Sequence, residues 1–293
     1  MTRNESDTAW KEILDAYFKD CIDYCLPKLS ELINWQKPFI SLDKELQAIT
    51  KGTENGRRLL DKLFKVFLKD GREQWVLIHI EVQGKPDDAF PKRMFTYGYR
   101  IYDKYQQPVV SCAILTDDSK RWRPDHYEIN FAGSYLSCGF LLIKLIDYRN
   151  KLKELEASTN PFASVILVQL AALEARSKPD EQRKQVKFAL TRRLYEKGFS
   201  KKEVSNLYKF IDWLIGLPKP LELKYLNEVY ELEESKKMAY VSNAEKFGME
   251  RGIKKVAEQS LEQGLKPAVI KRITGLSLVQ IKALQQKLKR AKH

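Results

Sequence analysis

Two apolar runs that flank a short polar turn, between Asp61 and Gln83, constrain the fold of this chain more than any other feature. The turn contains Gly71, which can adopt the positive φ that hairpin turns need. If the two runs pair symmetrically about Gly71, Asp61 lies opposite Glu81. Side chains of directly opposed residues project from one face of the sheet, with Cβ atoms about 5 Å apart. Gln83 shares this face because strand side chains alternate with a period of two.

This pairing predicts that two carboxylates and an amide converge on one small surface. Hard divalent cations prefer oxygen ligands, and Mg²⁺ accepts one or two carboxylates while it keeps several waters. The predicted ligands are Asp61, Glu81 and the backbone carbonyl of Val82, with Glu45 of a preceding helix approaching from the side. We expect Mg²⁺, with Mn²⁺ as the alternative ion, and Gln83 to orient a water or a phosphate. The competing interpretation is a solvated polar strand face, and a slip of one residue would turn Asp61 away from Glu81.

Such a site suits phosphodiester hydrolysis, because a bound metal polarises the phosphate and lowers the pKa of an attacking water. After the hairpin, a helix predicted over 89–105 places Arg93, Tyr97 and Arg100 on one face. The forked donors of arginine suit phosphate contact, so Arg93 and Tyr97 are candidate DNA-binding residues. Ion pairing to nearby aspartates is the alternative for these arginines. Lys85, directly after the motif, is a further candidate for contact with DNA phosphates.

Two other side chains have open interpretations. His79 shares the face of Glu81 and is either a base or a hydrogen-bonded structural residue. Trp122, in the string W-R-P, either stacks on a nucleic-acid base or anchors a loop.

The first half of the chain mixes strands and helices. Apolar spacing predicts helices over 8–26 and 42–49, and strands over 109–115, 127–131 and 138–146. This order indicates an α/β or α+β core. After Asp147 the pattern is helical only, with helices predicted over 163–175, 181–197, 201–214 and 221–234. We therefore expect a core domain over 1–150, a helical appendage over 151–235 and a basic helical tail over 236–293.

The tail is strongly basic. The segment 235–293 contains 14 Lys and Arg residues against 4 Glu, so most of the net charge of +13 lies in the last fifth of the chain. A basic tail indicates a polyanionic partner, most often nucleic acid. After a charged helix over 244–263, residues 267–288 are predicted as helix, turn and helix, with Gly275 in the turn. Its candidate DNA-binding residues are Lys271, Arg272 and Lys282. The competing interpretation is a helical hairpin for self-association, which would make the chain a homo-oligomer.

Composition argues against other classes of protein. The first residues lack an apolar signal-peptide core, and the longest apolar stretches, such as 139–146, are too short to span a bilayer. We expect a cytosolic protein with no membrane partner. The four cysteines and three histidines show no metal-ligand spacing, so a zinc site is not expected and the thiols are predicted to be reduced and buried.

These residues carry a resemblance to a known family. Asp61 followed by Glu81-Val82-Gln83 resembles the motif of the PD-(D/E)XK nuclease superfamily. A longer series is similar to the recombination-promoting nuclease family, also described as YhgA-like transposases: I-H-I-E-V-Q-G, R-M-F-T-Y-G-Y-R-I-Y, A-I-L-T-D, W-R-P, and N-P-F-A at 160–163. The resemblance covers roughly residues 8–290.

The resemblance implies a metal-dependent DNA endonuclease with a restriction-endonuclease-like αβββαβ core, linked to recombination or mobile elements. The family's metal ligands carry onto Asp61 and Glu81, its third motif residue onto Gln83, and its upstream helix acid onto Glu45. The superfamily usually has Lys where Gln83 stands. Lys stabilises the hydroxide and the developing negative charge, whereas Gln only forms hydrogen bonds. The alternative expectation is therefore a weakly active or inactive relative that binds DNA and oligomerises.

Overall fold

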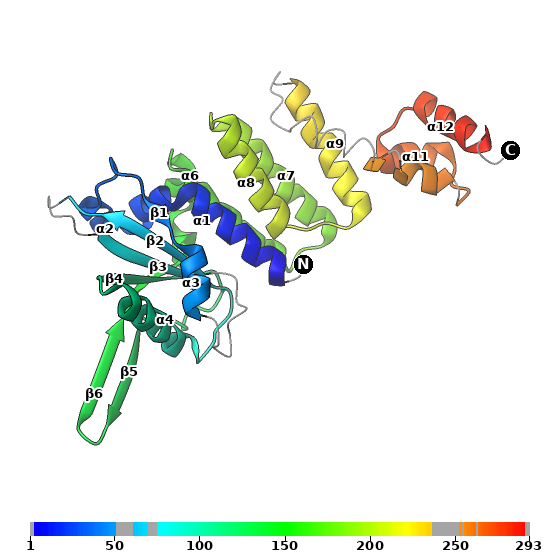
Figure 1. Ribbon diagram of the computed structural model, residues 1–293. Coiled ribbons are helices and arrows are strands. Elements are labelled where there is room, and N and C mark those ends of the chain that lie inside the picture. Colours follow the sequence, from blue (N-terminus) through cyan, green and yellow to red (C-terminus); the bar gives the residue numbers. More distant parts are fainter. Residues whose placement is uncertain are drawn as a thin grey trace. The chain divides into compact units, whose positions relative to one another are not determined.

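The computed structural model describes residues 3–50, 61–69, 75–235, 252–253, 255–261 and 263–290. The chain divides into two compact units, Met1–Leu173 and Glu174–His293. The first unit contains a mixed five-stranded sheet with helices, and the described part of the second unit is built from helices (Figure 1). The fold is therefore α+β, within the class that the mixed first half predicts.

Five strands form the central sheet, and their order in space follows their order in the sequence. They are β1 (Ile40–Ser41), β2 (Asp61–Phe67), β3 (Trp75–Gln83), β4 (Val109–Leu115) and β7 (Leu141–Lys144). β1 pairs antiparallel with β2, and β2 antiparallel with β3, whereas β3, β4 and β7 are parallel. Parallel neighbours need a crossover connection, and the helix α4 (Phe90–Tyr105) provides the one between β3 and β4.

The β2–β3 pairing confirms the predicted hairpin. Asp61 lies opposite Glu81, the register that symmetry about Gly71 requires. Val and Ile at alternate positions of β3 favour the extended conformation. The predicted turn itself falls on residues 70–74, which lie outside the described residues.

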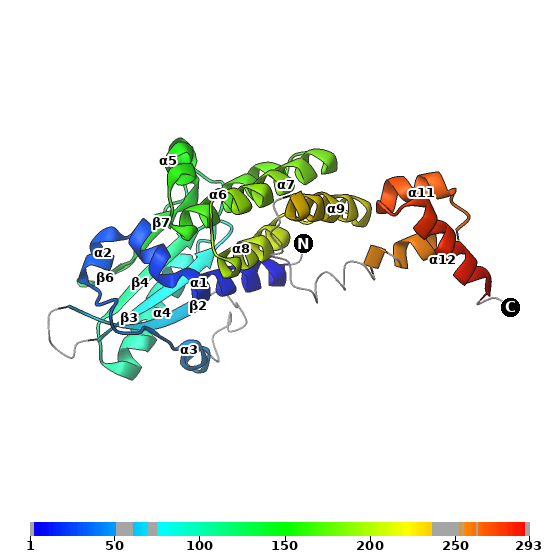
Figure 2. The ribbon, with the colours of Figure 1, turned by 90° about the horizontal axis from the view of Figure 1, so that it is seen from above.

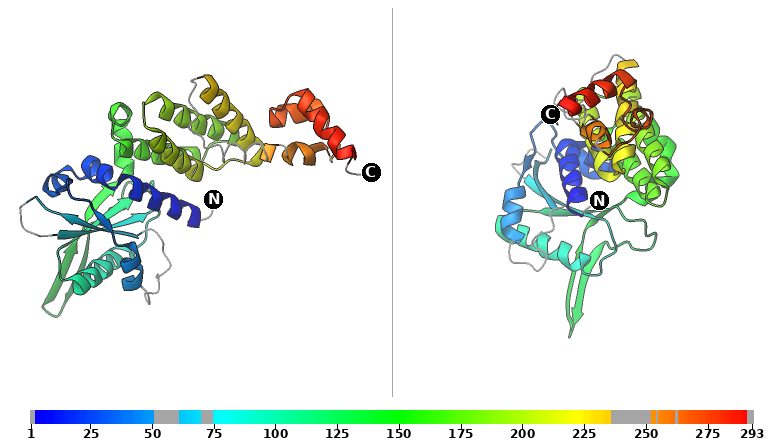
Figure 3. Two further views of the ribbon diagram at one scale, coloured as in Figure 1. Left: turned by 45° about the horizontal axis from the view of Figure 1, so that its top comes forward. Right: turned by 90° about the vertical axis from the view of Figure 1, so that its right-hand side faces the viewer.

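Each face of β3 is buried under a different helix. On one face, Ile78 of β3 and its partner Phe64 of β2 lie under α1 (Arg3–Cys25), where Phe18 stacks on Phe64 with ring centroids 3.9 Å apart. The opposite face, which carries Glu81, lies under α4, where Met94 packs against β4. The sheet thus lies between α1 and α4 (Figure 3). A charged residue in β3 is therefore surrounded by packed side chains and needs a polar partner.

A separate hairpin follows β4 and consists of β5 (His126–Phe131) and β6 (Ser134–Gly139). Its turn uses Ala132 and Gly133, both at positive φ, as a two-residue type I′ turn requires. The prediction of one strand over 138–146 is wrong, because β6 ends at Gly139 and β7 begins at Leu141 in the other sheet. A continuous apolar run carries no signal for the point at which the chain passes between sheets.

The first unit also contains several shorter or later helices. They are α2 (Pro27–Leu32), α3 (Asp43–Thr50), the 3₁₀ helix η1 (Leu145–Lys151), α5 (Leu152–Ala157) and α6 (Pro161–Ala175), which runs across the boundary between the units. The predicted helices over 42–49 and 163–175 correspond to α3 and α6. Within the described ranges, none of the helices combines the length and apolarity that a bilayer span demands.

Three helices open the second unit and confirm the remaining helical predictions. They are α7 (Asp180–Glu196), α8 (Lys201–Leu214) and α9 (Lys219–Ser235), which lie side by side (Figure 2). Ser200 caps α8 in a capping box with Glu203. Lys187 is fully buried, and its Nζ lies 2.7 Å from Asp212 and 2.8 Å from Glu222.

The end of the chain forms the predicted helix, turn and helix. α11 (Pro267–Thr274) and α12 (Leu278–Arg290) flank Gly275, which has a φ of 71°. Ile270 and Ile281 of these helices share a small core with Ala257. Ala257 belongs to a helical stretch over 255–261, so a third segment supplies the core contacts that two short helices lack. Residues 244–251 of the predicted charged helix lie outside the described residues.

Two glycines of this tail form a matched pair for a stability measurement. Gly264 and Gly275 have φ values of 77° and 71°, so alanine at either position costs about 1–2 kcal/mol. A Cβ atom at Gly264 meets open space, whereas at Gly275 it collides with the amide of Asn227, which donates to the Thr274 carbonyl at 3.1 Å. We expect Gly275→Ala to lower the free energy of unfolding by about 1 kcal/mol more than Gly264→Ala, as measured by urea denaturation. Equal losses in the two variants would contradict this contact.

Candidate functional site at the end of the central strands

Two polar side chains of the predicted motif, Glu81 and Gln83, lie together at the end of β3. Glu81 and Gln83 alternate along the strand and therefore share the face covered by α4. Across the β2–β3 pair, the backbone of Asp61 lies opposite Glu81. The side chain of Asp61 lies outside the described part of the structure.

Arg93 of α4 is the centre of the contacts at this end of the strand. Its Nε donates to Oε1 of Glu81 at 2.6 Å, its Nη2 to Oε1 of Gln83 at 3.0 Å, and its Nη1 to Oδ2 of Asp87 at 2.9 Å. Arg93 is only 6% exposed, and Glu81 and Gln83 are buried as well. A buried carboxylate without a positive partner is strongly destabilising. Arg93 therefore allows Glu81 to occupy this position.

The surroundings keep Arg93 charged. Burial alone lowers the pKa of its guanidinium, but the neighbouring Glu81 and Asp87 outweigh burial and raise the pKa above its ordinary value. The ring of Phe90 lies 5.2 Å from Cζ and adds a cation–π contact. The result is a permanent positive charge that α4 holds over the end of β3.

Both ends of the Gln83 amide are engaged. Oε1 accepts from Arg93, and Nε2 donates to the carbonyl of Lys85 at 2.7 Å. The backbone carbonyl of Gln83 accepts from the N–H of Thr116 at 2.9 Å. Gln83 therefore connects α4, the turn after β3 and the loop after β4, and its side chain has one defined orientation.

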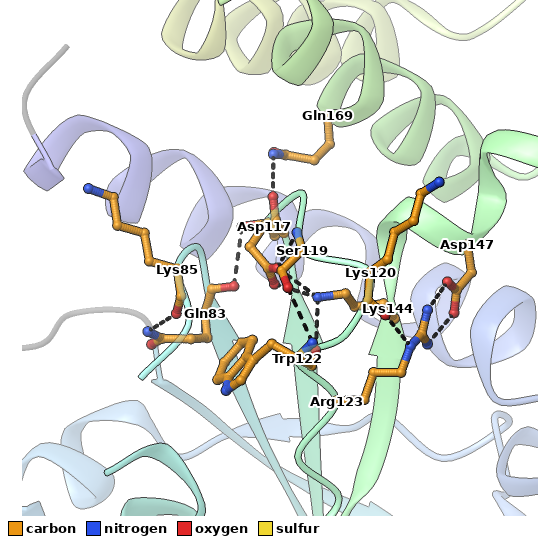
Figure 4. A network of polar contacts seen from close by, with 11 residues as sticks. Gln83, Lys85, Asp117, Ser119, Lys120, Trp122, Arg123, Lys144, Asp147 and Gln169 are labelled. Carbon is orange, nitrogen blue, oxygen red and sulfur yellow. Dashed lines mark hydrogen bonds and ion pairs between the residues drawn. The ribbon is translucent and has the colours of Figure 1, made fainter. Parts of the chain in front are cut away.

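A second buried ion pair lies at the same edge of the sheet, and the sequence analysis missed it. The Nζ of Lys144 lies 2.7 Å from both carboxylate oxygens of Asp117 and 3.1 Å from the carbonyl oxygen of Trp122 (Figure 4). Asp117 also accepts from the N–H of Ser119 at 2.8 Å. Strand register places Lys144 level with Gln83 across β4. The available sequence signal is a lone lysine inside an otherwise apolar strand.

Trp122 anchors the loop that follows β4. Its ring packs against Phe90 with centroids 5.6 Å apart, and the ammonium of Lys144 lies 5.5 Å from it. The next residue, Arg123, forms an ion pair with Asp147 at 2.8 Å, and both of these side chains are exposed. Of the two interpretations of Trp122, these contacts favour the structural one.

His79 is buried two residues before Glu81 and on the same face. Its ring meets Tyr97 edge-on, with centroids 5.8 Å apart. Within the described structure, neither ring nitrogen has a hydrogen-bond partner. Burial, with a smaller contribution from Arg93, lowers the pKa of His79 to about 4. A ring this weakly basic suits a neutral structural role better than that of a proton acceptor.

Glu45 lies in the first turn of α3 and is not brought beside Glu81. Its charge acts on Tyr105, whose pKa is raised mainly by burial and to a smaller extent by Glu45. Tyr105 is the last residue of α4, whereas Arg93 lies in its first turn. Twelve helical residues span about 18 Å, so Glu45 and the Arg93 contacts lie at opposite ends of this helix.

The predicted DNA-binding residues fall into two groups. Arg93 and Tyr97 are buried, because the side of α4 that carries them packs on the sheet. Helical spacing identifies such a face but not what covers it. The exposed group consists of Lys85 beside Gln83, and of Lys271, Arg272 and Lys282 on α11 and α12.

Among the described side chains, no group of three or more His, Cys, Asp or Glu residues is placed to hold a metal ion. The side chain of Asp61 is outside that set. The four cysteines are free. Cys21 and Cys112 are buried as predicted, and burial raises the pKa of their thiols, whereas Cys25 and Cys138 are only half-buried, so the prediction of burial is wrong for these two.

No family model, curated protein or solved structure matches this chain. Any functional assignment therefore depends on the residues and their geometry.

The Lys144–Asp117 pair predicts a large and site-specific stability effect. Lys144→Met leaves Asp117 buried without a counter-charge, and we expect the free energy of unfolding to fall by about 3–5 kcal/mol. Arg123→Met is the matched control, because its ion pair with Asp147 is exposed and contributes about 1 kcal/mol or less. The double variant Lys144→Met/Asp117→Asn should recover much of the loss. Urea denaturation at pH 7 measures all three, and equal losses in the two single variants would contradict the pair's role.

Because burial lowers the pKa of His79, we expect the free energy of unfolding to depend on pH. Because folding lowers its pKa from 6.5 to about 4, the unfolded chain binds a proton between these values that the folded chain does not. The contribution is fully present above pH 6.5 and is lost as the pH falls towards 4, by up to about 3 kcal/mol. His79→Phe removes this titration, so its free energy of unfolding should fall less between pH 7.5 and 5. The same slope in both proteins would show that His79 is not the group responsible.

Proposed function

We propose that this chain is a metal-dependent DNA endonuclease of the PD-(D/E)XK type, of the kind linked to recombination or mobile elements. The observation that carries this assignment is the β2–β3 register, which sets Asp61 opposite Glu81. Gln83 follows on the same face at the end of β3. These are the three positions that the superfamily motif requires.

The order of elements adds support. α1 precedes β1, β2 and β3, and α4 and β4 follow, which is compatible with the αβββαβ order that the resemblance implies. Two further helices interrupt this order, α2 between α1 and β1 and α3 between β1 and β2. With α1 and α4 on opposite faces of the sheet, we assign the first unit to a restriction-endonuclease-like core.

The donor chemistry fits a magnesium ion. Glu81 is a buried carboxylate that already accommodates a positive group at one oxygen, and Asp61 is registered opposite it. Mg²⁺ takes one or two carboxylates and completes its shell with water. Asp61, Glu81 and the backbone carbonyl of Val82 would hold it, without Glu45. When bound, the ion supplies polarisation of the phosphate and a lower pKa for a coordinated water.

The second unit is suited to hold the nucleic acid. α11 and α12 form a helix-turn-helix with its own small core, and Lys271, Arg272 and Lys282 are exposed on it. Cations at such positions contact DNA phosphates without regard to sequence. This arrangement supports DNA as the partner of the chain.

A second candidate function is a DNA-binding, oligomerising relative without efficient catalysis. The observation that favours it is the amide at Gln83, which is fully engaged with Arg93 and Lys85 and carries no charge. Steeply salt-dependent binding of DNA, with no cleavage in Mg²⁺ or Mn²⁺, would establish this alternative.

The nuclease assignment predicts cleavage that depends on two carboxylates. The purified full-length chain should nick or cut duplex DNA in the presence of Mg²⁺. Asp61→Asn and Glu81→Gln should each lower the rate by at least about 100-fold, because each removes negative charge from the proposed ion site. A plasmid-nicking assay measures the rates, and circular dichroism shows whether the variants remain folded.

Two exposed acids serve as matched controls for this experiment. Asp103→Asn at the end of α4 and Glu128→Gln in β5 change the same functional groups on the surface. Both should cut at the wild-type rate. Unchanged cleavage by folded Asp61→Asn and Glu81→Gln proteins would refute the assigned site.

A further inference from the structure

A buried arginine lies beside the one motif residue at which this chain departs from the superfamily pattern. The guanidinium of Arg93 spans Glu81 and Gln83, which are two residues apart on one strand face. The guanidinium therefore lies directly beside position 83, where the superfamily usually has a lysine. The positive charge missing from position 83 is present, but it comes from α4.

Gln83 is the residue type that this arrangement requires. Its Oε1 accepts the Nη2 proton of Arg93 at 3.0 Å in a buried setting. A lysine side chain has three donors and no acceptor, so the substitution Gln83→Lys would leave Nη2 without its acceptor. It would also place a second cation against the guanidinium, away from water, where like charges repel strongly. A lysine at position 83 and an arginine at position 93 therefore destabilise each other in this arrangement.

Arginine is also better suited than lysine to deliver charge from this buried position. Its charge is delocalised and weakly hydrated, and its planar fork keeps a fixed orientation. Of its five N–H donors, three are used by Glu81, Gln83 and Asp87. One further N–H remains on each Nη atom. An arginine N–H of this kind forms a strong, charge-assisted hydrogen bond to a phosphate oxygen.

We infer that Arg93 supplies the positive charge that a lysine at position 83 supplies elsewhere in the superfamily, and that Gln83 is the acceptor that positions it. This inference rests on the proposed nuclease function. In that reaction Arg93 donates to a phosphate oxygen and stabilises the negative charge that develops there. Asp87 and Phe90 hold the guanidinium in place from α4 and the turn before it.

A charge-relocation series tests this inference in the full-length chain. Arg93→Gln removes the cation, Gln83→Lys adds a second one, and the double variant Gln83→Lys/Arg93→Gln returns the cation to the usual position. Both single variants should have lower melting temperatures than the wild type, because one leaves Glu81 unbalanced and the other crowds two cations. The double variant should melt above both single variants. Lys104→Gln, at the exposed end of α4, is the matched control and should change neither melting nor metal binding.

The affinity for Mn²⁺ alone, measured by calorimetry, distinguishes a charge beside the ion site from a merely structural arginine. Arg93→Gln should bind Mn²⁺ more tightly than the wild type, because a competing cation beside Glu81 is gone. Gln83→Lys should bind it more weakly, and the double variant should return to the wild-type affinity. Arg93→Lys keeps the charge and should retain the wild-type affinity. If Arg93→Gln fails to fold, a clear change of Mn²⁺ affinity in Arg93→Lys would contradict the role of the charge, and the weaker binding expected of Gln83→Lys would support it.

Cleavage of plasmid DNA separates this inference from the nuclease function itself. Both single variants should cut at least about 100-fold more slowly than the wild type, and the double variant should regain about tenfold or more. A wild type that cuts, with Mn²⁺ affinities that do not shift in opposite directions, would overturn the role of Arg93 and leave the nuclease function intact. A wild type that never cuts, with the expected affinity shifts, would reject the nuclease function and keep the charge placement. Absence of Mn²⁺ binding by the wild type would overturn both.

Discussion

The ion pair between Glu81 and Arg93 is the interaction on which the candidate site depends. A carboxylate buried at the end of a central strand requires a positive partner, and α4 provides one from its first turn at 2.6 Å. The same guanidinium fixes Gln83 and Asp87, so one side chain connects the strand, the helix and the turn between them. Both motif residues therefore have defined orientations in a packed environment.

The neighbouring strands β4 and β7 also end in a buried ion pair. Lys144 and Asp117 form a second buried pair at the ends of β7 and β4, and the loop between them is tied to Gln83 through Thr116. Burying two ion pairs at the carboxyl ends of β3, β4 and β7 costs free energy. Once their hydrogen bonds are satisfied, these pairs fix the positions of the side chains around them. Open α/β sheets commonly bind ligands at the carboxyl ends of their strands. The region around Gln83 is thus polar, and its side chains are held by defined contacts, as the proposed function requires.

Local patterns in the sequence were sufficient for much of this fold. Symmetry about Gly71 predicted the register of Asp61 and Glu81, because a tight turn fixes pairing over the strands that it joins. The strand over 109–115 and the helices of the second half followed from apolar spacing.

The site depends on contacts between residues that are far apart in the sequence, which local patterns do not indicate. Helical spacing placed Arg93 and Tyr97 on one face but could not show that the sheet covers it, and nothing local to Lys144 indicates Asp117, 27 residues earlier, as its partner. The division of 138–146 between two sheets was missed for the same reason.

A crystal structure of the full-length chain soaked with Mn²⁺, with the ion located by its anomalous scattering, would show whether Asp61 and Glu81 share a metal ion. We expect one ion bound by a carboxylate oxygen of Asp61 and one of Glu81, with Arg93 still in contact with Gln83. Carboxylates of Asp61 and Glu81 that point to different faces of the sheet, or an ion bound only elsewhere, would contradict this expectation.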